Sequence, residues 1–362
     1  MNTELSPNTQ AILLLAAPLI TPGRSRKSDW LSAGEYRKLA VRLRSLDAQP
    51  ADLLEPGADA LIEECGATID SARLRSLLGR GFLLAQALQQ WQARAIWVIS
   101  RADAAYPRKL KERLRSNAPS LLYGCGPSEL LHAPGFAIVG SRNVDEPLLD
   151  YTRNVATLAA GANRILVSGA ARGVDRAAMN GALDAGGKAT GVLAGGLQRA
   201  VMNREHRNLL LEERLVLISP FDPAAGFQVG NAMQRNKSIY ALADAGLVVN
   251  AVRNKGGTWA GALEQLRKYP VPVYVRSTGI PSDGLDALRA EGARPWPNPT
   301  NPDELEEVLE APPCTRPAAG EQGELFHDEA TQSITAQERG RQSEPTAPTL
   351  DLPKRAVRHV AR

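Results

Sequence analysis

Several short segments combine glycine with a hydroxyl, a cation or a carboxylate, and these residue types together are suited to binding phosphate. The three clearest segments comprise Gly140, Ser141 and Arg142; Ser168, Gly169, Arg172, Gly173 and Asp175; and Gly256, Gly257 and Thr258. Glycine lets backbone N–H groups approach an oxyanion, and a guanidinium group adds positive charge. The sequence therefore predicts a surface that binds phosphate groups.

A fourth segment, Arg235-Asn236-Lys237, opens a predicted helix. The N-terminus of a helix favours anions because its backbone N–H groups are free and its dipole is positive there. Asp175 also falls in a predicted first helical turn. Its negative charge is expected either to be stabilised by the helix dipole or to orient Arg172. The cations of these segments are expected to share one phosphate-binding rim.

The elements that position these residues alternate between apolar runs and helix-like segments. Strands are predicted over 136–139, 165–168, 189–193, 247–250 and 271–275, with helices over 146–160, 175–185, 204–212, 235–243 and 258–268. Short apolar runs of this kind are typical of a parallel sheet that is buried on both faces. Ligands bind such sheets beyond the carboxyl ends of the strands. The fold class is therefore predicted as doubly wound α/β with a mostly parallel, Rossmann-like sheet, edged or extended by strands over 95–100 and 119–124.

The chain divides by composition into three parts. Residues 1–92 are predicted to form a helical domain, 93–310 an extended Rossmann-like domain, and 311–362 a disordered tail rich in small and polar residues. Within the helical part, Gly79-Arg80-Gly81 allows two interpretations. It is either the end of one helix followed by the start of another, or a hairpin that grips a DNA backbone.

The composition limits the classes of function that this protein can have. The 362 residues carry a net charge of +4, which permits nucleic acid as a partner without requiring it. The three cysteines are far apart and the four histidines are scattered, so we predict no disulfide framework, no metal and no cofactor. The apolar run over 12–20 is too short to span a bilayer, and we expect a cytoplasmic protein without membrane contact.

In combination, these motifs resemble the DprA/Smf family of DNA-processing proteins. The resemblance rests on Ala137 to Arg142, Ser168 to Asp175, Val192 to Leu197 and the upstream Tyr106-Pro107 and Pro119 to Gly124 segments. It implies an extended Rossmann domain, a helical N-terminal domain of SAM-like or helix-hairpin-helix-like type, and homodimerisation. It also implies binding of the phosphate backbone of single-stranded DNA, without catalysis, and transfer of that DNA to a RecA recombinase during DNA uptake or recombination.

Under the same resemblance, the phosphate contacts fall on the glycine loops and on Arg142, Arg172, Arg235 and Lys237. Base stacking has three aromatic candidates, Phe221, Tyr240 and Trp259, although each is more simply a core residue.

A second hypothesis is a nucleotide-binding sensor or a nucleotide hydrolase, which could serve in defence against foreign DNA. The related LOG phosphoribohydrolases place a glutamate soon after a Gly-Gly-x-Gly-Thr turn. Here the first glutamate after Thr258 is Glu264, and that helical offset turns its carboxylate away from the turn. No Gly-x-Gly-x-x-Gly fingerprint follows the first strand, so redox chemistry with a nicotinamide cofactor is not expected.

Overall fold

The computed structural model describes residues 5–19 and 29–310. The described residues belong to one compact unit, Met1–Pro312. The predicted tail, residues 311–362, lies outside the described part of the chain.

The described strands form one nine-stranded sheet in the order β1-β2-β6-β5-β4-β3-β7-β8-β9. The strands are β1 Trp97–Ser100, β2 Leu121–Cys125, β3 Gly135–Val139, β4 Ile165–Ser168, β5 Ala189–Val192, β6 Leu215–Ser219, β7 Ala245–Val248, β8 Val273–Val275 and β9 Arg294–Pro295. Pairing is antiparallel from β1 to β2 and from β2 to β6, and it is parallel from β6 to β9. The predicted mostly parallel α/β sheet is therefore confirmed.

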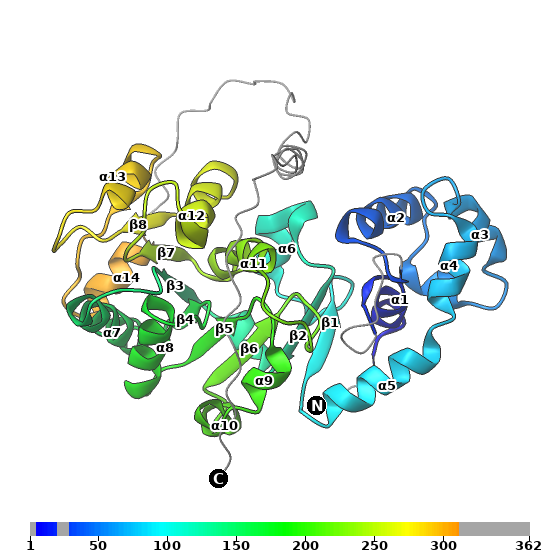
Figure 1. The fold of residues 1–362 in the computed structure, drawn as a ribbon, viewed down its shortest axis with the longest axis horizontal. Helices are drawn as coiled ribbons and strands as arrows, with labels where there is room; N and C mark the ends of the chain where they lie inside the picture. The colour runs from blue at the N-terminus through cyan, green and yellow to red at the C-terminus, as the bar shows by residue number, and fades with distance from the viewer. Residues whose placement is uncertain (1–4, 20–28, 311–362) are drawn as a thin grey trace, which may run out of the picture. The chain divides into compact units, whose positions relative to one another are not determined.

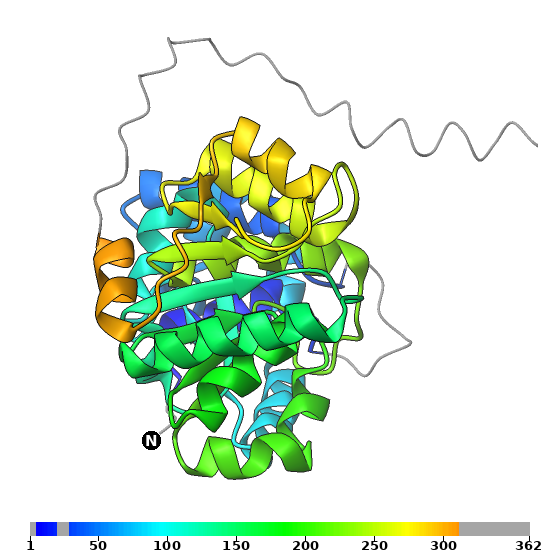
Figure 2. The same ribbon diagram turned by 90° about the vertical axis from the view of Figure 1, so that its left-hand side faces the viewer.

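Helices cover both faces of this sheet. Successive residues of each strand point to opposite faces, so each strand contributes side chains to two apolar cores. In β3, Phe136 and Ile138 belong to one apolar core, while Ala137 and Val139 belong to the other. The first core packs against α7 Glu146–Gly161, α8 Val174–Asp184, α9 Leu197–Val201, α10 Arg204–Leu211 and α14 Pro302–Glu310. The second packs against α6 Arg108–Leu114, α11 Val229–Leu242, α12 Gly256–Lys268 and α13 Asp283–Ala290. Figure 2 shows the green helices α7 and α8 on one side of the sheet and the yellow helices α12 and α13 on the other.

The N-terminal part is helical, as predicted. Its helices are α1 Pro7–Ala16, α2 Ala33–Ser45, α3 Asp59–Cys65, α4 Ser71–Leu78 and α5 Gly81–Gln92, with a 3₁₀ turn, η2, over Pro50–Leu54 (Figure 1). The apolar run that the sequence places at 12–20 begins inside α1, whose residues Ala11 to Leu15 are all buried among the other helices. No helix in the described ranges is long and apolar enough to cross a membrane.

The Gly79-Arg80-Gly81 segment separates two helices, which confirms the helix-end interpretation. Gly79 caps α4, and α5 begins at Gly81. The Arg80 guanidinium donates to the carbonyls of Asp29 at 2.6 Å and Ala17 at 3.0 Å, and it also donates to Leu14. Burial lowers the pKa of Arg80 to about 10. This arginine therefore binds the protein's own backbone.

The sequence-based element assignment omitted α9, and three further errors concern the sheet and the cationic segment. It omitted β6, which lies between β5 and β2 near the middle of the sheet. It made the strand that corresponds to β8 the last strand of the sheet, whereas the two-residue β9 pairs with β8 and forms the edge. It also began the helix before β7 at Arg235, whereas α11 begins at Val229, so the cationic segment lies within the helix rather than at its first turn.

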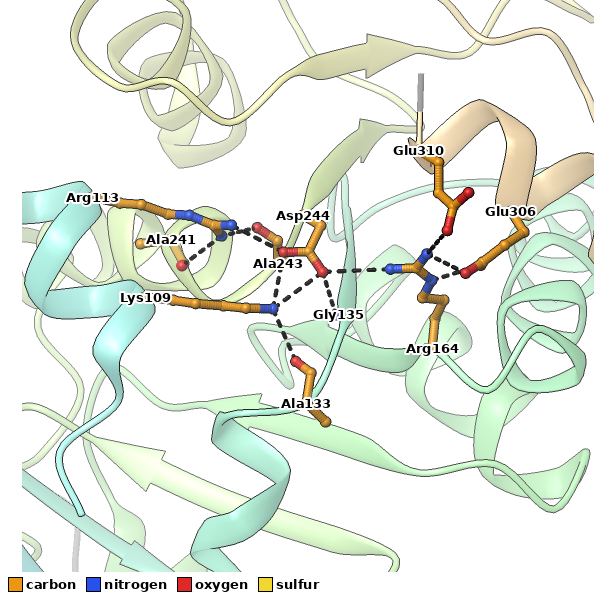
Figure 3. A network of polar contacts seen from close by, with 10 residues as sticks. All are labelled: Lys109, Arg113, Ala133, Gly135, Arg164, Ala241, Ala243, Asp244, Glu306 and Glu310. Atoms are coloured by element: carbon orange, nitrogen blue, oxygen red, sulfur yellow. Dashed lines mark hydrogen bonds and ion pairs between the residues drawn. The ribbon is translucent and has the colours of Figure 1, made fainter. Parts of the chain in front are cut away.

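An ionic network ties several elements together at the edge where β3, β4 and β7 begin (Figure 3). Asp244 accepts contacts from Lys109 and Arg113 of α6 at 2.9 Å each, and from Arg164, which precedes β4, at 3.5 Å. It also accepts the backbone N–H of Gly135 at 3.0 Å. One carboxylate therefore joins α6 to the starts of three strands.

We expect this network to make stability depend on acid pH. Burial raises the pKa of Asp244, but hydrogen bonds from Lys109 and Arg113 outweigh burial and leave that pKa below its ordinary value of 3.8. A lowered folded-state pKa stabilises the protein above the unfolded pKa, and that contribution is lost as pH falls through the folded pKa. The stability gap between the parent and Asp244→Asn should therefore be full at neutral pH and should close below about pH 4. Urea unfolding of both proteins across this range measures the gap, and a gap independent of pH would contradict the prediction.

Candidate nucleic-acid interface

The topology of the sheet places its switch point between β3 and β7, and we refer to the surface over the loops after these two strands as the crevice. The chain adds β4, β5 and β6 to one side of β3 and then returns to place β7 on its other side. Where the direction of winding reverses in this way, parallel α/β sheets commonly bind ligands beyond the carboxyl ends of the strands. The loop after β3 contains Gly140, Ser141 and Arg142, and the loop after β7 leads to Gly256 at the start of α12. Two of the predicted glycine segments therefore flank the crevice.

Hydrogen bonds hold these two loops together. The Thr258 hydroxyl donates to the Gly140 carbonyl at 3.0 Å. The Ser141 hydroxyl lies 3.5 Å from the carbonyl of Asn250, at the end of β7. The Asn236 amide donates to the Gly257 carbonyl at 2.8 Å, which fixes the turn that begins α12. The predicted residues Gly140, Ser141, Asn236, Gly257 and Thr258 are thus brought together by the structure.

The loop after β4 presses against the loop after β3. The Val174 N–H donates to the Ser141 carbonyl at 3.3 Å. Gly173, at φ +80°, lies so close that a Cβ there would be 2.5 Å from the backbone oxygens of Ser141 and Arg142. A residue with a side chain is disfavoured at this φ and has no room at this position. Gly173 therefore sets the position of the loop that carries Arg142.

Two buried residues of opposite charge lie behind these loops. Asp175 and Arg235 are 6% and 5% exposed. Burial raises the pKa of Asp175, and the nearby Arg235 and backbone hydrogen bonds oppose that rise. Burial also lowers the pKa of Arg235, against the effect of Asp175, and its guanidinium donates to the Val192 carbonyl. A Cβ at Gly169 would lie 2.0 Å from the Arg235 guanidinium, so this loop crosses directly over the pair.

The three residues of the Arg-Asn-Lys segment point in different directions from α11. Arg235 faces Asp175 beneath the crevice, and Asn236 faces the start of α12. Lys237 lines a separate cleft beside α2, described below. Successive helical residues are turned by about 100° from one another, so three neighbours cannot face one ligand. The structure therefore does not bring Arg235 and Lys237 together at the crevice.

Ser168 is fully buried, and its hydroxyl donates to the Ile138 carbonyl at 2.7 Å, which ties β4 to β3. Tyr240 and Trp259, two of the aromatic candidates for stacking, are buried in the second core. Phe221 remains partly exposed. Ser168, Tyr240 and Trp259 take these positions from the strand or helix that carries them, whereas Phe221 lies in the loop between β6 and α11.

Three exposed cations at the crevice are Arg142, Arg172 and Lys255, which is the N-cap residue of α12. None of the three has an ion-pair partner among the residues that the structure describes. The Arg142 guanidinium lies over the ring of Phe227, 5.1 Å from its centroid, and Phe227 is itself 55% exposed. Sequence analysis did not assign Phe227 or Lys255 to the site. The signal that could have revealed Phe227 is a large aromatic beside Gly226 in a polar loop.

This arrangement offers uncompensated positive charge, backbone N–H groups on rigid glycine turns, and an exposed aromatic ring under a guanidinium. Such a combination suits a chain of phosphates that carries flat bases. Glu264, the carboxylate that a hydrolase would need, instead pairs with Lys268 at 3.5 Å, one turn along α12.

Comparisons with known proteins agree with the resemblance seen in the sequence. A family model described as DNA recombination-mediator protein A matches residues 97–306. The DNA processing protein DprA of Streptococcus pneumoniae is 31% identical over 203 residues, which are 54% of this chain and 69% of that protein. Protein Smf of Escherichia coli is 32% identical over 181 residues, 48% of each chain.

The X-ray structure of DprA from Streptococcus pneumoniae shares the fold, with a TM-score of 0.61 at 22% identity over 77% of this chain and 94% of that one. The chain spans about half the length of the Escherichia coli relative and of the Mycobacterium tuberculosis relatives. Because the family model covers more than half of the chain, the predicted resemblance is confirmed: this chain belongs to the DNA recombination-mediator protein A family, which includes the DprA and Smf proteins.

Proposed function

We propose that this protein binds single-stranded DNA through its phosphate backbone at the crevice between β3 and β7. The proposed role is to protect the strand and pass it to a RecA-type recombinase. The proposal rests on Arg142 and Arg172, two exposed arginines without an ion-pair partner among the described residues. They lie on two glycine loops that are packed against each other.

Three features support this proposal. The cations stand where the topology leaves room for a ligand. Phe227 offers a stacking surface beside one of them, and base stacking tolerates any sequence. Membership in a family described as a recombination mediator supports the transfer step. Backbone contacts carry no sequence information, so we expect little base preference.

The proposal also includes a homodimer that acts in the cytoplasm. Met202 and Leu211 are 69% and 74% exposed. Met202 directly follows α9, Leu211 is the last residue of α10, and both short helices lie beside β6. Large apolar side chains on an exposed surface favour burial against a second chain. Family membership supports the same assembly.

The proposal predicts salt-dependent binding that weakens when the two arginines are removed. Each phosphate contact on a single strand contributes about −0.7 to the slope of log affinity against log salt. Arg142→Ala/Arg172→Ala should therefore make the slope shallower by about 1.4 and weaken binding at low salt. Fluorescence anisotropy of a labelled oligonucleotide, titrated at several salt concentrations, measures both quantities.

Arg267→Ala/Arg289→Ala is a control for the loss of two formal charges, in which the arginines pair with Glu291 and Asp286. It removes two charges from the last turns of α12 and α13, which run from the crevice edge towards the opposite edge of the sheet. The control should keep the slope of the parent. If both double variants lose slope equally, the attraction is a general effect of charge and the crevice is not the site. If the parent does not bind at low salt, the single-strand proposal is wrong.

A further inference from the structure

A cavity opens beside α2. It encloses about 790 Å³ and is bordered by α2, by residues 115–121 leading into β2, by residues 220–225 after β6, and by α11. We refer to it as the α2 cleft. Its volume falls in the range of about 300–1,000 Å³ that is typical of ligand sites.

The α2 cleft is strongly cationic. Its lining includes five cationic residues: Arg37, Arg44, Arg101, Arg115 and Lys237. The lining holds one carboxylate, Asp222, and none of the five cations forms an ion pair with a described residue. Arg37 makes one contact, to the Asn117 side chain at 3.5 Å. Cations kept apart from carboxylates in a concave surface attract anions.

The sequence of α2 explains how this helix presents its charge to the cleft. Leu39 and Leu43 are buried towards the helical region, while Arg37, Val41 and Arg44 follow the spacing of a second face. Lys38 and Arg42 belong to the same helix but do not line the cleft. The helix therefore carries two sets of cations, and only one of them faces the cavity.

Flat apolar surfaces lie among these cations. Trp30 and Phe221 both line the cleft and are partly exposed. Tyr36 is 8% exposed and contributes to the wall. Positive charge interleaved with aromatic rings is the pattern of surfaces that bind single strands, with phosphates on the cations and bases on the rings.

One loop contributes residues to both the α2 cleft and the crevice. The loop between β6 and α11 places Phe221 in the α2 cleft and Phe227 under Arg142. Six residues of extended chain span at most about 20 Å, which is the upper limit of the separation between the Cα atoms of these two residues. The Gly196 N–H donates to the Ala225 carbonyl at 2.6 Å and anchors this loop to the loop after β5.

From these observations we propose that the α2 cleft binds a further segment of the same DNA strand, which continues from the crevice past Phe227 and Phe221. The inference rests on the proposed function and adds a second binding segment to it. The helical N-terminal region then contributes directly to DNA binding, through Arg37 and Arg44.

The test compares strand lengths. Labelled oligothymidylates of about 4 to about 16 nucleotides, the range of known site sizes, are titrated with the full chain by anisotropy. The variants are Arg37→Ala/Arg44→Ala and the matched control Lys38→Ala/Arg42→Ala, which removes two charges from the same helix outside the cleft. Circular dichroism of both variants checks that α2 is intact.

We expect Arg37→Ala/Arg44→Ala to match the parent on the shortest strands. On the longest strands its salt slope should be shallower by about 1.4, and the control should match the parent throughout. Equal binding of the parent and the cleft variant at every length would overturn the inference. Equal losses on the shortest and longest strands would also overturn it, because the cleft would then not be an extension.

Two outcomes separate the inference from the proposed function. If the crevice variant Arg142→Ala/Arg172→Ala loses binding at all lengths while the cleft variant loses none, the proposed function stands and the extension is wrong. If the parent binds thymidine monophosphate as tightly as any strand, and only the cleft variant loses that binding, the cleft is a small-nucleotide site and the extension is again wrong.

Discussion

Gly173→Ala should abolish most single-strand binding while leaving the protein folded. The φ of Gly173 is +80°, and an alanine Cβ would lie 2.5 Å from two backbone oxygens of the loop that carries Arg142. Backbone atoms cannot rotate away as a side-chain tip can, so the loop must move. The conformation alone costs about 1–3 kcal/mol for a residue other than glycine. Displacement of Arg142 from its position should weaken binding at least about tenfold, which corresponds to 1.4 kcal/mol.

Gly186→Ala separates backbone strain from the clash. Gly186 has a φ of +83°, nearly the same as Gly173, but no atom lies within 4 Å of the position that its Cβ would occupy. It follows α8 and is remote from the crevice loops. In urea unfolding both variants should lose the stability that the positive φ costs, and Gly173→Ala should lose more because of the clash. Only Gly173→Ala should lose DNA binding in anisotropy. Parent-like affinity of Gly173→Ala would show that the position of the Arg142 loop does not matter.

Asp175→Asn should be the most destabilising single change at the site. It leaves the Arg235 guanidinium, 5% exposed, without its carboxylate. Breaking a buried ion pair typically costs about 3–5 kcal/mol, because the remaining charge has no water to replace the lost partner. We take this range as an upper limit for Asp175→Asn, because burial raises the pKa of Asp175 despite the nearby Arg235. The free energy of unfolding in urea measures this cost. Asp286→Asn is the control, since Asp286 pairs with Arg289 at 2.6 Å but is 55% exposed. Exposed pairs contribute at most about 1 kcal/mol.

The double variant Asp175→Asn/Arg235→Gln tests whether the cost comes from the unpaired charge. It removes both charges and should recover much of the stability lost in Asp175→Asn. It also tests the predicted phosphate contact of Arg235. Because this guanidinium is buried beneath Gly169, we expect the salt slope of binding to stay as in the parent. A slope shallower by about 0.7 would instead assign one phosphate contact to Arg235.

The sequence was sufficient to predict the fold class because the parallel strands are buried on both faces. Runs such as 165–168, read as a strand from four consecutive apolar or small residues, correspond to β4 without any shift. Helices with clear caps were also located closely, as for α7, which begins at Glu146. The strand order could not be read from local patterns, because it depends on which strands pair across long stretches of chain. The crevice between β3 and β7 is a consequence of that order.

The sequence predicted which residues belong to the candidate site, but it did not predict where their side chains point. Glycine and hydroxyl positions such as Gly140 and Thr258 meet as expected, since both follow neighbouring strands. The directions of Arg235 and Lys237 depended on the true start of α11, six residues before the predicted one. A cation and its buried carboxylate are far apart in sequence here, so no local pattern distinguishes Arg235 from an exposed arginine such as Arg142. That distinction needs the tertiary structure.

The buried helix α1 also bears on how the protein is made. The Thr9 hydroxyl bonds to Ser100 at 2.8 Å and to Asp103 at 2.6 Å, across 91 and 94 residues of sequence. Ribosomes add about 5–20 residues per second, so α1 is synthesised roughly 5–20 s before these partners exist. During that interval its leucine-rich surface has only the other N-terminal helices to cover it. Translation speed and chaperone supply are therefore expected to influence the yield of folded protein through this helix.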